Sequence, residues 1–121
     1  MEVAARILAP PLWIEIDNME SKERHVYTEL RQCYSSLLMN GPFTIIAAHN
    51  GEMIGLTDRI KLRPLTAGIK GHMLYLSSEE SAIHLVSRNL ERVWSPRGGE
   101  PVIGRLRTMK TLEVLASEVR K

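Results

Sequence analysis

The sequence has 121 residues, a formal net charge of +2 and 25% charged residues, which is the size and balance of one domain rather than two. A single cysteine excludes an intrachain disulfide framework and a cysteine-rich metal site, and it is typical of a reducing compartment such as the cytoplasm. The basic residues form no dense run and the chain has no long apolar stretch, so we expect neither a nucleic-acid partner nor a membrane span.

The N-terminal third is predicted to be helical, with one interruption. Residues 2–8 have a short helical pattern that ends before Pro10 and Pro11, and residues 12–19 read as a connecting segment. Apolar residues then recur at helical spacing over 21–39, which predicts one helix with a single buried stripe that includes Cys33.

Two β-hairpins are predicted in the middle of the chain. Alternating apolar segments at 43–49 and 52–57 flank Asn50 and Gly51, the pair best suited to a two-residue turn with positive φ angles. A second hairpin pairs 65–69 with 72–77 around Lys70 and Gly71. The intervening residues 58–63 are charged at alternate positions and are expected to be irregular or an edge.

The last third is predicted to mix helix and strand. Ser77 and Glu80 have the spacing of a capping box for a helix over 78–90. Its expected inner positions are Ala82, Ile83, Leu85, Val86 and Leu90. Short strands at 92–94 and 101–106 and a final helix at 108–120 follow. Antiparallel hairpins with flanking helices predict a single α+β domain over residues 1–121.

Several segments, in their order and spacing, resemble the later part of the glutaminase domain of class II glutamine amidotransferases. They are NGPF at 40–43, GLTDRIKLRPL at 55–65, LYLSSEE at 74–80 and WSPRGGEPVI at 94–103, preceded by PPLW at 10–13 and IDNM at 16–19. The most similar form is the archaeal-type glutamate synthase amidotransferase subunit. The resemblance implies part of the αββα sandwich of N-terminal-nucleophile hydrolases.

The catalytic apparatus of that family has no counterpart in this sequence. The family's nucleophile is an N-terminal cysteine whose own α-amino group serves as the base, whereas this sequence begins with Met1 and Glu2. An internal Cys33 cannot supply that geometry, and it is interpreted as a small buried hydrophobe. The family's glutamine-binding residues lie earlier in its domain than the matched region. We therefore assign no catalytic residue and expect the chain alone to be inactive.

The weak candidates for substrate binding are Asp58, Arg59 and Arg63, with Lys61 beside them. They could line a ligand cleft or the mouth of an ammonia channel, or they could fix the crossover between the hairpins through ion pairs and hydrogen bonds. The structural role is favoured. The four histidines lie on separate elements and the glycines lack P-loop spacing, so we expect no metal and no cofactor.

Two hypotheses for the function remain at this stage. In the first, the chain is the C-terminal segment of a glutamate-synthase-like amidotransferase domain and completes a partner chain that carries the cysteine. In the second, it is a non-catalytic interaction or regulatory module that has kept the fold and that could form a homodimer. A further reading is that the sequence is a truncated piece of a longer protein.

Overall fold

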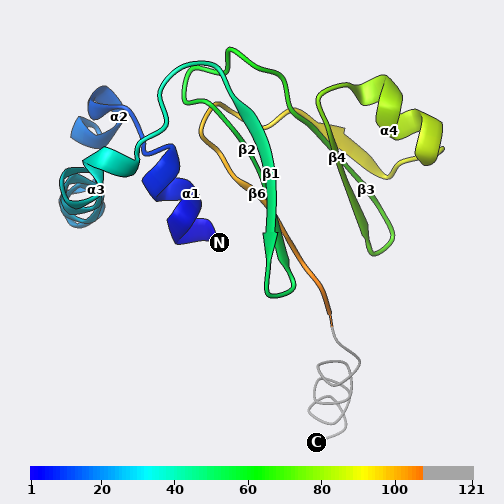
Figure 1. Cartoon of the computed structure of the whole chain (residues 1–121), viewed down its shortest axis with the longest axis horizontal. Helices are drawn as coiled ribbons and strands as arrows, with labels where there is room; N and C mark the ends of the chain where they lie inside the picture. Colours follow the sequence, from blue (N-terminus) through cyan, green and yellow to red (C-terminus); the bar gives the residue numbers. More distant parts are fainter. Residues whose placement is uncertain (108–121) are drawn as a thin grey trace, which may run out of the picture.

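The computed structural model describes residues 1–107, and within them the fold is α+β, as predicted (Figure 1). The predicted final helix at 108–120 lies outside the described residues. The helices are α1 (Glu2–Leu8), α2 (Trp13–Asp17), α3 (Ser21–Cys33) and α4 (Glu80–Val86), with a 3-10 turn, η1 (Ser35–Leu37). The strands are β1 (Thr44–His49), β2 (Glu52–Thr57), β3 (Thr66–Lys70), β4 (Met73–Ser77), β5 (Arg92–Trp94) and β6 (Val102–Arg105).

The strands form two antiparallel sheets of three strands each. The first has the order β1-β2-β6 and the second has the order β4-β3-β5. Both predicted hairpins are confirmed, and in the first turn Asn50 and Gly51 have φ angles of 48° and 74°. The second turn is one residue later than predicted. Lys70 pairs with Met73, so its two loop residues are Gly71, with a φ of 55°, and His72.

The first sheet packs a helix on one face and the second sheet on the other. Ile54 and Leu56 of β2 form the buried apolar core with Ala5 and Ala9 at α1. Gly55 points the opposite way because side chains alternate along a strand. A methyl group at Gly55 would lie 2.9 Å from Leu76 Cδ1 of β4. The bare glycine therefore lets the two sheets approach closely.

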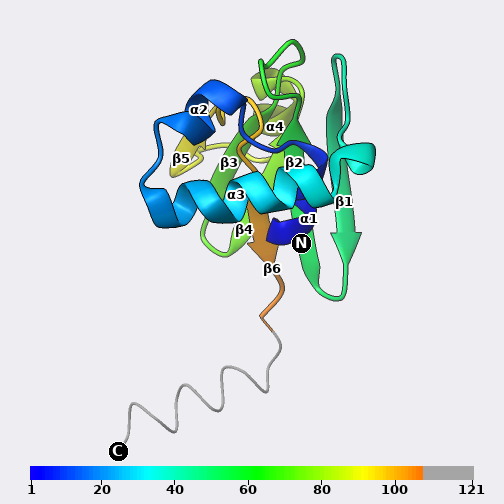
Figure 2. The same cartoon turned by 90° about the vertical axis from the view of Figure 1, so that its left-hand side faces the viewer.

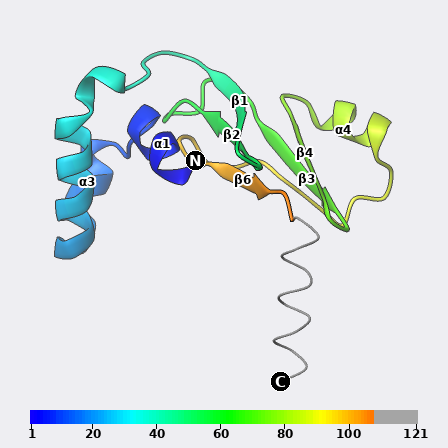
Figure 3. The same ribbon diagram turned by 60° about the horizontal axis from the view of Figure 1, so that its bottom comes forward.

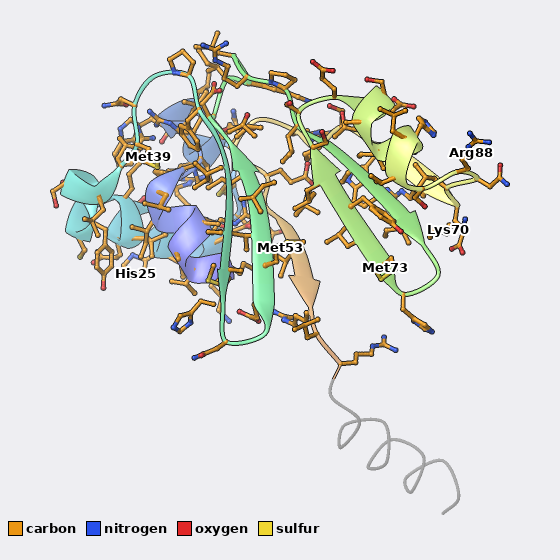
Figure 4. The ribbon with its side chains drawn as sticks, turned by 45° about the vertical axis from the view of Figure 1, so that its right-hand side comes forward. His25, Met39, Met53, Lys70, Met73 and Arg88 are labelled. Atoms are coloured by element: carbon orange, nitrogen blue, oxygen red, sulfur yellow. The ribbon has the colours of Figure 1, made fainter. Side chains whose placement is uncertain are left out.

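The second sheet carries α4 on its outer face. A methyl group at Gly68 of β3 would lie 3.3 Å from Ile83 of α4 and 3.4 Å from Leu90. Figures 1 and 3 accordingly show the order α1, first sheet, second sheet, α4. Met53 extends from β2 (Figure 4) and, with Leu74 and Gly104, lines a hollow of about 530 Å³ at the turn end of the two hairpins.

Two predictions for the N-terminal helices are wrong. Residues 12–19, expected to be a connecting segment, contain the short helix α2. At its start the backbone N–H of Leu12 donates to Glu15 Oε2 at 2.6 Å, and the helix buries Ile16. The helix predicted over 21–39 ends at Cys33, has no buried residue, and leaves Cys33 exposed. Helical periodicity predicts that a helix has an apolar face, but not whether another element packs on that face. Here α3 lies across α1 at the outside of the molecule (Figure 2).

The helix predicted over 78–90 is shorter than expected. It begins at Glu80 and ends at Val86, and no side chain caps it. The capping box is absent, because Ser77 Oγ accepts a hydrogen bond from the N–H of Glu79 instead. Of the expected inner positions Ile83 is buried, whereas Leu85 and Val86 are 86% and 74% exposed. Leu90 still reaches Gly68, but from the non-helical chain after α4.

The close approach of the sheets predicts that Gly55→Val destabilises the protein. The added carbons would meet Leu76 and Leu65, which are packed in the interior, and overpacking of this kind costs about 1–3 kcal/mol. The free energy of unfolding from urea denaturation measures the effect. Ala48→Val introduces the same side chain at an exposed position of β1 and is the control, with an expected change within about 0.5 kcal/mol. Equal stability of the two variants would refute the tight sheet contact.

Candidate functional site

Asp58 lies at the junction between the two sheets, directly after β2. Its side chain is 2% exposed, and its carboxylate accepts hydrogen bonds from the backbone N–H groups of Leu62 at 2.8 and 3.0 Å and of Arg63 at 3.1 Å. A longer bond comes from the N–H of Phe43 at 3.4 Å, and the N–H of Asp58 donates to the Phe43 carbonyl at 3.0 Å. The carboxylate therefore joins the start of β1 to the crossover.

These hydrogen bonds keep Asp58 ionised. Burial acts to raise the pKa of Asp58, but the backbone N–H groups of Leu62, Arg63 and Phe43 outweigh it, so the pKa lies below the ordinary aspartate value. A carboxylate whose acceptor positions are occupied by the backbone has a structural role. No ion pair joins Asp58 to Arg59 within the described residues.

Lys61 ties the crossover to the connection between β5 and β6. Its backbone is left-handed, with a φ of 54°, and its N–H donates to the Asp58 carbonyl at 3.0 Å. Its ammonium group donates to Ser95 Oγ at 2.7 Å and to the Pro96 carbonyl at 2.5 Å. Ser95 Oγ in turn donates to the Leu65 carbonyl at 3.0 Å.

The side chains of Arg59 and Arg63 border two separate hollows of the surface. Arg59 lines a cavity of about 340 Å³ between the helical end of the molecule and the loop before β6. Arg63 is exposed and borders a separate shallow hollow with Pro42 and Ser78. The three candidates Asp58, Arg59 and Arg63 therefore do not converge on one ligand position, and their assignment to substrate binding stays a prediction.

The cavity beside Arg59 contains three arginines from distant parts of the chain. It is lined by Arg6, Ala9, Pro10, Pro11, Glu15, Met19, Arg59, Arg97, Gly98, Gly99 and Glu100. Arg59 Nη2 donates to Asn40 Oδ1 at 3.3 Å, but Arg59 Nη1 and Arg6 Nε are buried and have no hydrogen-bond partner. An unpaired buried donor costs about 1–3 kcal/mol, and more when it is charged.

Sequence reasoning missed this cavity. Arg6 lies in the predicted helix at 2–8 and Arg97 between the predicted strands at 92–94 and 101–106, and nothing in their spacing links either of them to Arg59. The available signal was the pair Gly98 and Gly99. A methyl group at Gly98 would collide with the carbonyl oxygen of Arg59, so a glycine there marks close contact between two loops.

Residues 1–107 contain neither a candidate metal site nor a candidate membrane-spanning helix. No group of three or more His, Cys, Asp or Glu side chains there could hold a metal ion. Among those residues, no helix combines the length and the apolar character that a membrane crossing needs.

Comparison with known proteins finds one informative relative. An uncharacterised protein of Archaeoglobus fulgidus is 54% identical over 120 residues, which cover 98% of this chain and 32% of that protein. The chain thus spans about a third of the length of this relative. No protein-family model and no solved structure matches the chain.

The hydrogen bonds of Asp58 predict an acid-dependent stability. Because its pKa is lowered in the folded state, the stabilisation is complete above the unfolded value of about 3.9 and is lost as the pH falls through the lower folded value. Asp58→Asn removes the charge and places an amide donor against backbone donors, so it should cost about 1–3 kcal/mol at neutral pH.

Urea denaturation between about pH 2 and 7 measures both effects. Asp58→Asn should flatten the acid limb of the stability curve, whereas Glu29→Gln, at an exposed position of α3, should leave it unchanged. Identical curves for Asp58→Asn and the unaltered protein would contradict the assignment.

Proposed function

We propose that this chain is the C-terminal segment of a glutamate-synthase-like class II glutamine amidotransferase domain, whose reaction converts glutamine to glutamate and ammonia. On this proposal it lacks the N-terminal cysteine nucleophile, is inactive alone, and completes the sandwich of a separate polypeptide that carries the cysteine.

The observation that carries the proposal is the order of layers. Two sheets pack face to face between α1 on one outer face and α4 on the other. This order supports the αββα sandwich that the resemblance implies, and the segments that resemble the amidotransferases supply the end of β2, the crossover from one sheet to the other and most of β4.

The described part also has the features of an incomplete sandwich. Each sheet has three strands, and within residues 1–107 the outer edges of β1, β6, β4 and β5 are unpaired. Open edges favour the addition of further strands. Large apolar side chains are exposed on the helical side and on β1, where Ile46 is 53% exposed; the others include Trp13, Val26, Tyr34 and Leu37. A further polypeptide would cover such groups.

The length of the relative and the position of Cys33 are compatible with a segment that works together with additional sequence. The relative from Archaeoglobus fulgidus is about three times as long as the matched region, so related sequence occurs together with additional chain. Cys33, at the end of α3, is exposed and internal, and on the proposal it takes no part in the reaction.

Reconstitution tests the proposal. The chain is mixed with a separately produced polypeptide that contains the remaining two thirds of the Archaeoglobus fulgidus relative, and glutamate release from glutamine is measured. We expect no glutaminase activity from the chain alone and measurable activity from the complex, because the nucleophile and this part of the scaffold lie on different polypeptides.

Cys33→Ser is the control and should leave the activity of the complex unchanged. Activity of the chain alone, or its loss with Cys33→Ser, would overturn the proposal. Formation of a stable but inactive complex, or of a homodimer that excludes the second polypeptide, would favour the non-catalytic interaction module instead.

A further inference from the structure

The cavity formed by the three arginines has an excess of positive charge without internal partners. Within the described residues, no carboxylate lies within ion-pair distance of Arg6, Arg59 or Arg97. These side chains come from α1, from the crossover after β2 and from the loop before β6. Three separate elements therefore bring guanidinium groups to one hollow.

The two glutamates in the wall are occupied by the backbone. Glu15 Oε2 accepts the N–H of Leu12 at 2.6 Å, and Glu100 Oε2 accepts the N–H of Arg97 at 2.9 Å. Each carboxylate thereby stabilises a turn at the rim. They reduce the net charge of the cavity, but within the described residues neither carboxylate forms an ion pair with Arg6, Arg59 or Arg97.

Two donor atoms of the arginines beside the cavity have no hydrogen-bond partner within the described residues. Arg59 Nη1 and Arg6 Nε are both buried, and both residues line the hollow. Arg31, which donates to the Pro11 carbonyl at 2.8 Å and stacks on Trp13 at 4.2 Å, adds a fourth positive charge nearby. Burial and, to a smaller extent, the positive charge of Arg59 lower the pKa of Arg31.

Glycine shapes the part of the wall next to Arg59. Gly99 has a φ of 71°, and a methyl group there would lie 3.5 Å from the Ala9 carbonyl oxygen and 3.6 Å from Arg59 Cγ. The glycine turn therefore lets the loop before β6 approach Arg59 and the end of α1 closely. A hollow of about 340 Å³ is at the lower end of the range for small-molecule sites.

We propose that this cavity binds a small molecule through an oxyanion group, a carboxylate or a phosphate, held by Arg6, Arg59 and Arg97. The guanidinium fork matches the paired oxygens of either group. The proposal rests on the cavity alone and does not require the amidotransferase function.

Isothermal titration of the full chain with inorganic phosphate, malonate and L-glutamate tests it. At least one should bind saturably, and the preferred anion identifies phosphate or carboxylate as the ligand class. Arg59→Gln and Arg97→Gln should each weaken binding about tenfold or more, because each removes a charged hydrogen-bond donor. Arg59→Lys, which keeps the charge without the fork, should bind at an intermediate level.

Arg88→Gln is the matched control. Arg88 is exposed and lies beyond α4, next to Lys70 and far from the cavity (Figure 4). The Arg88→Gln variant should bind the anions as the unaltered chain does. Circular dichroism checks that each variant is folded. If Arg59→Gln does not fold, Arg97→Gln, at an exposed position, decides. Absence of saturable binding at about 10 mM of every anion, or equal weakening by Arg88→Gln and Arg97→Gln, would overturn the proposal.

Discussion

The carboxylate of Asp58 is the interaction on which the arrangement of the two sheets depends. A buried charge is costly unless it is hydrogen-bonded, and here backbone N–H groups of Phe43, Leu62 and Arg63 supply the bonds. One side chain thus holds the beginning of β1, the end of β2 and the crossover that leads to β3. The direction in which the chain leaves the first sheet follows from this constraint.

The same crossover forms one side of the arginine cavity. With Asp58 fixed, Arg59 is placed against the loop at Gly98, and Lys61 reaches the carbonyl of Pro96 in the chain leading to β6. The cavity is therefore built from the backbone contacts that hold the sheets together.

Local patterns in the sequence predicted the elements whose determinants are local. Asn50 and Gly51 form the predicted turn because the positive φ angles are a property of those two residues. The predicted burial of Cys33 and the predicted length of the helix at α4 were wrong. Both properties depend on which part of the protein covers the helix, and helical periodicity does not contain that information. Of the ion pairs and hydrogen bonds expected at the crossover, Asp58 forms the hydrogen bonds, with backbone N–H groups, and no ion pair with Arg59 within residues 1–107. The meeting of Arg6, Arg59 and Arg97 is tertiary and left no local pattern.

Amide hydrogen exchange at Leu62 and Arg63 tests the central role of Asp58 most directly. Both residues lie outside regular secondary structure, with exposed side chains, so an ordinary loop would leave their amides unprotected. Bonding to the buried Asp58 carboxylate predicts protection comparable to that of the β2 amides, and selective loss of that protection with Asp58→Asn. Exchange of both amides at the rate of an unstructured peptide in the unaltered protein would contradict the account.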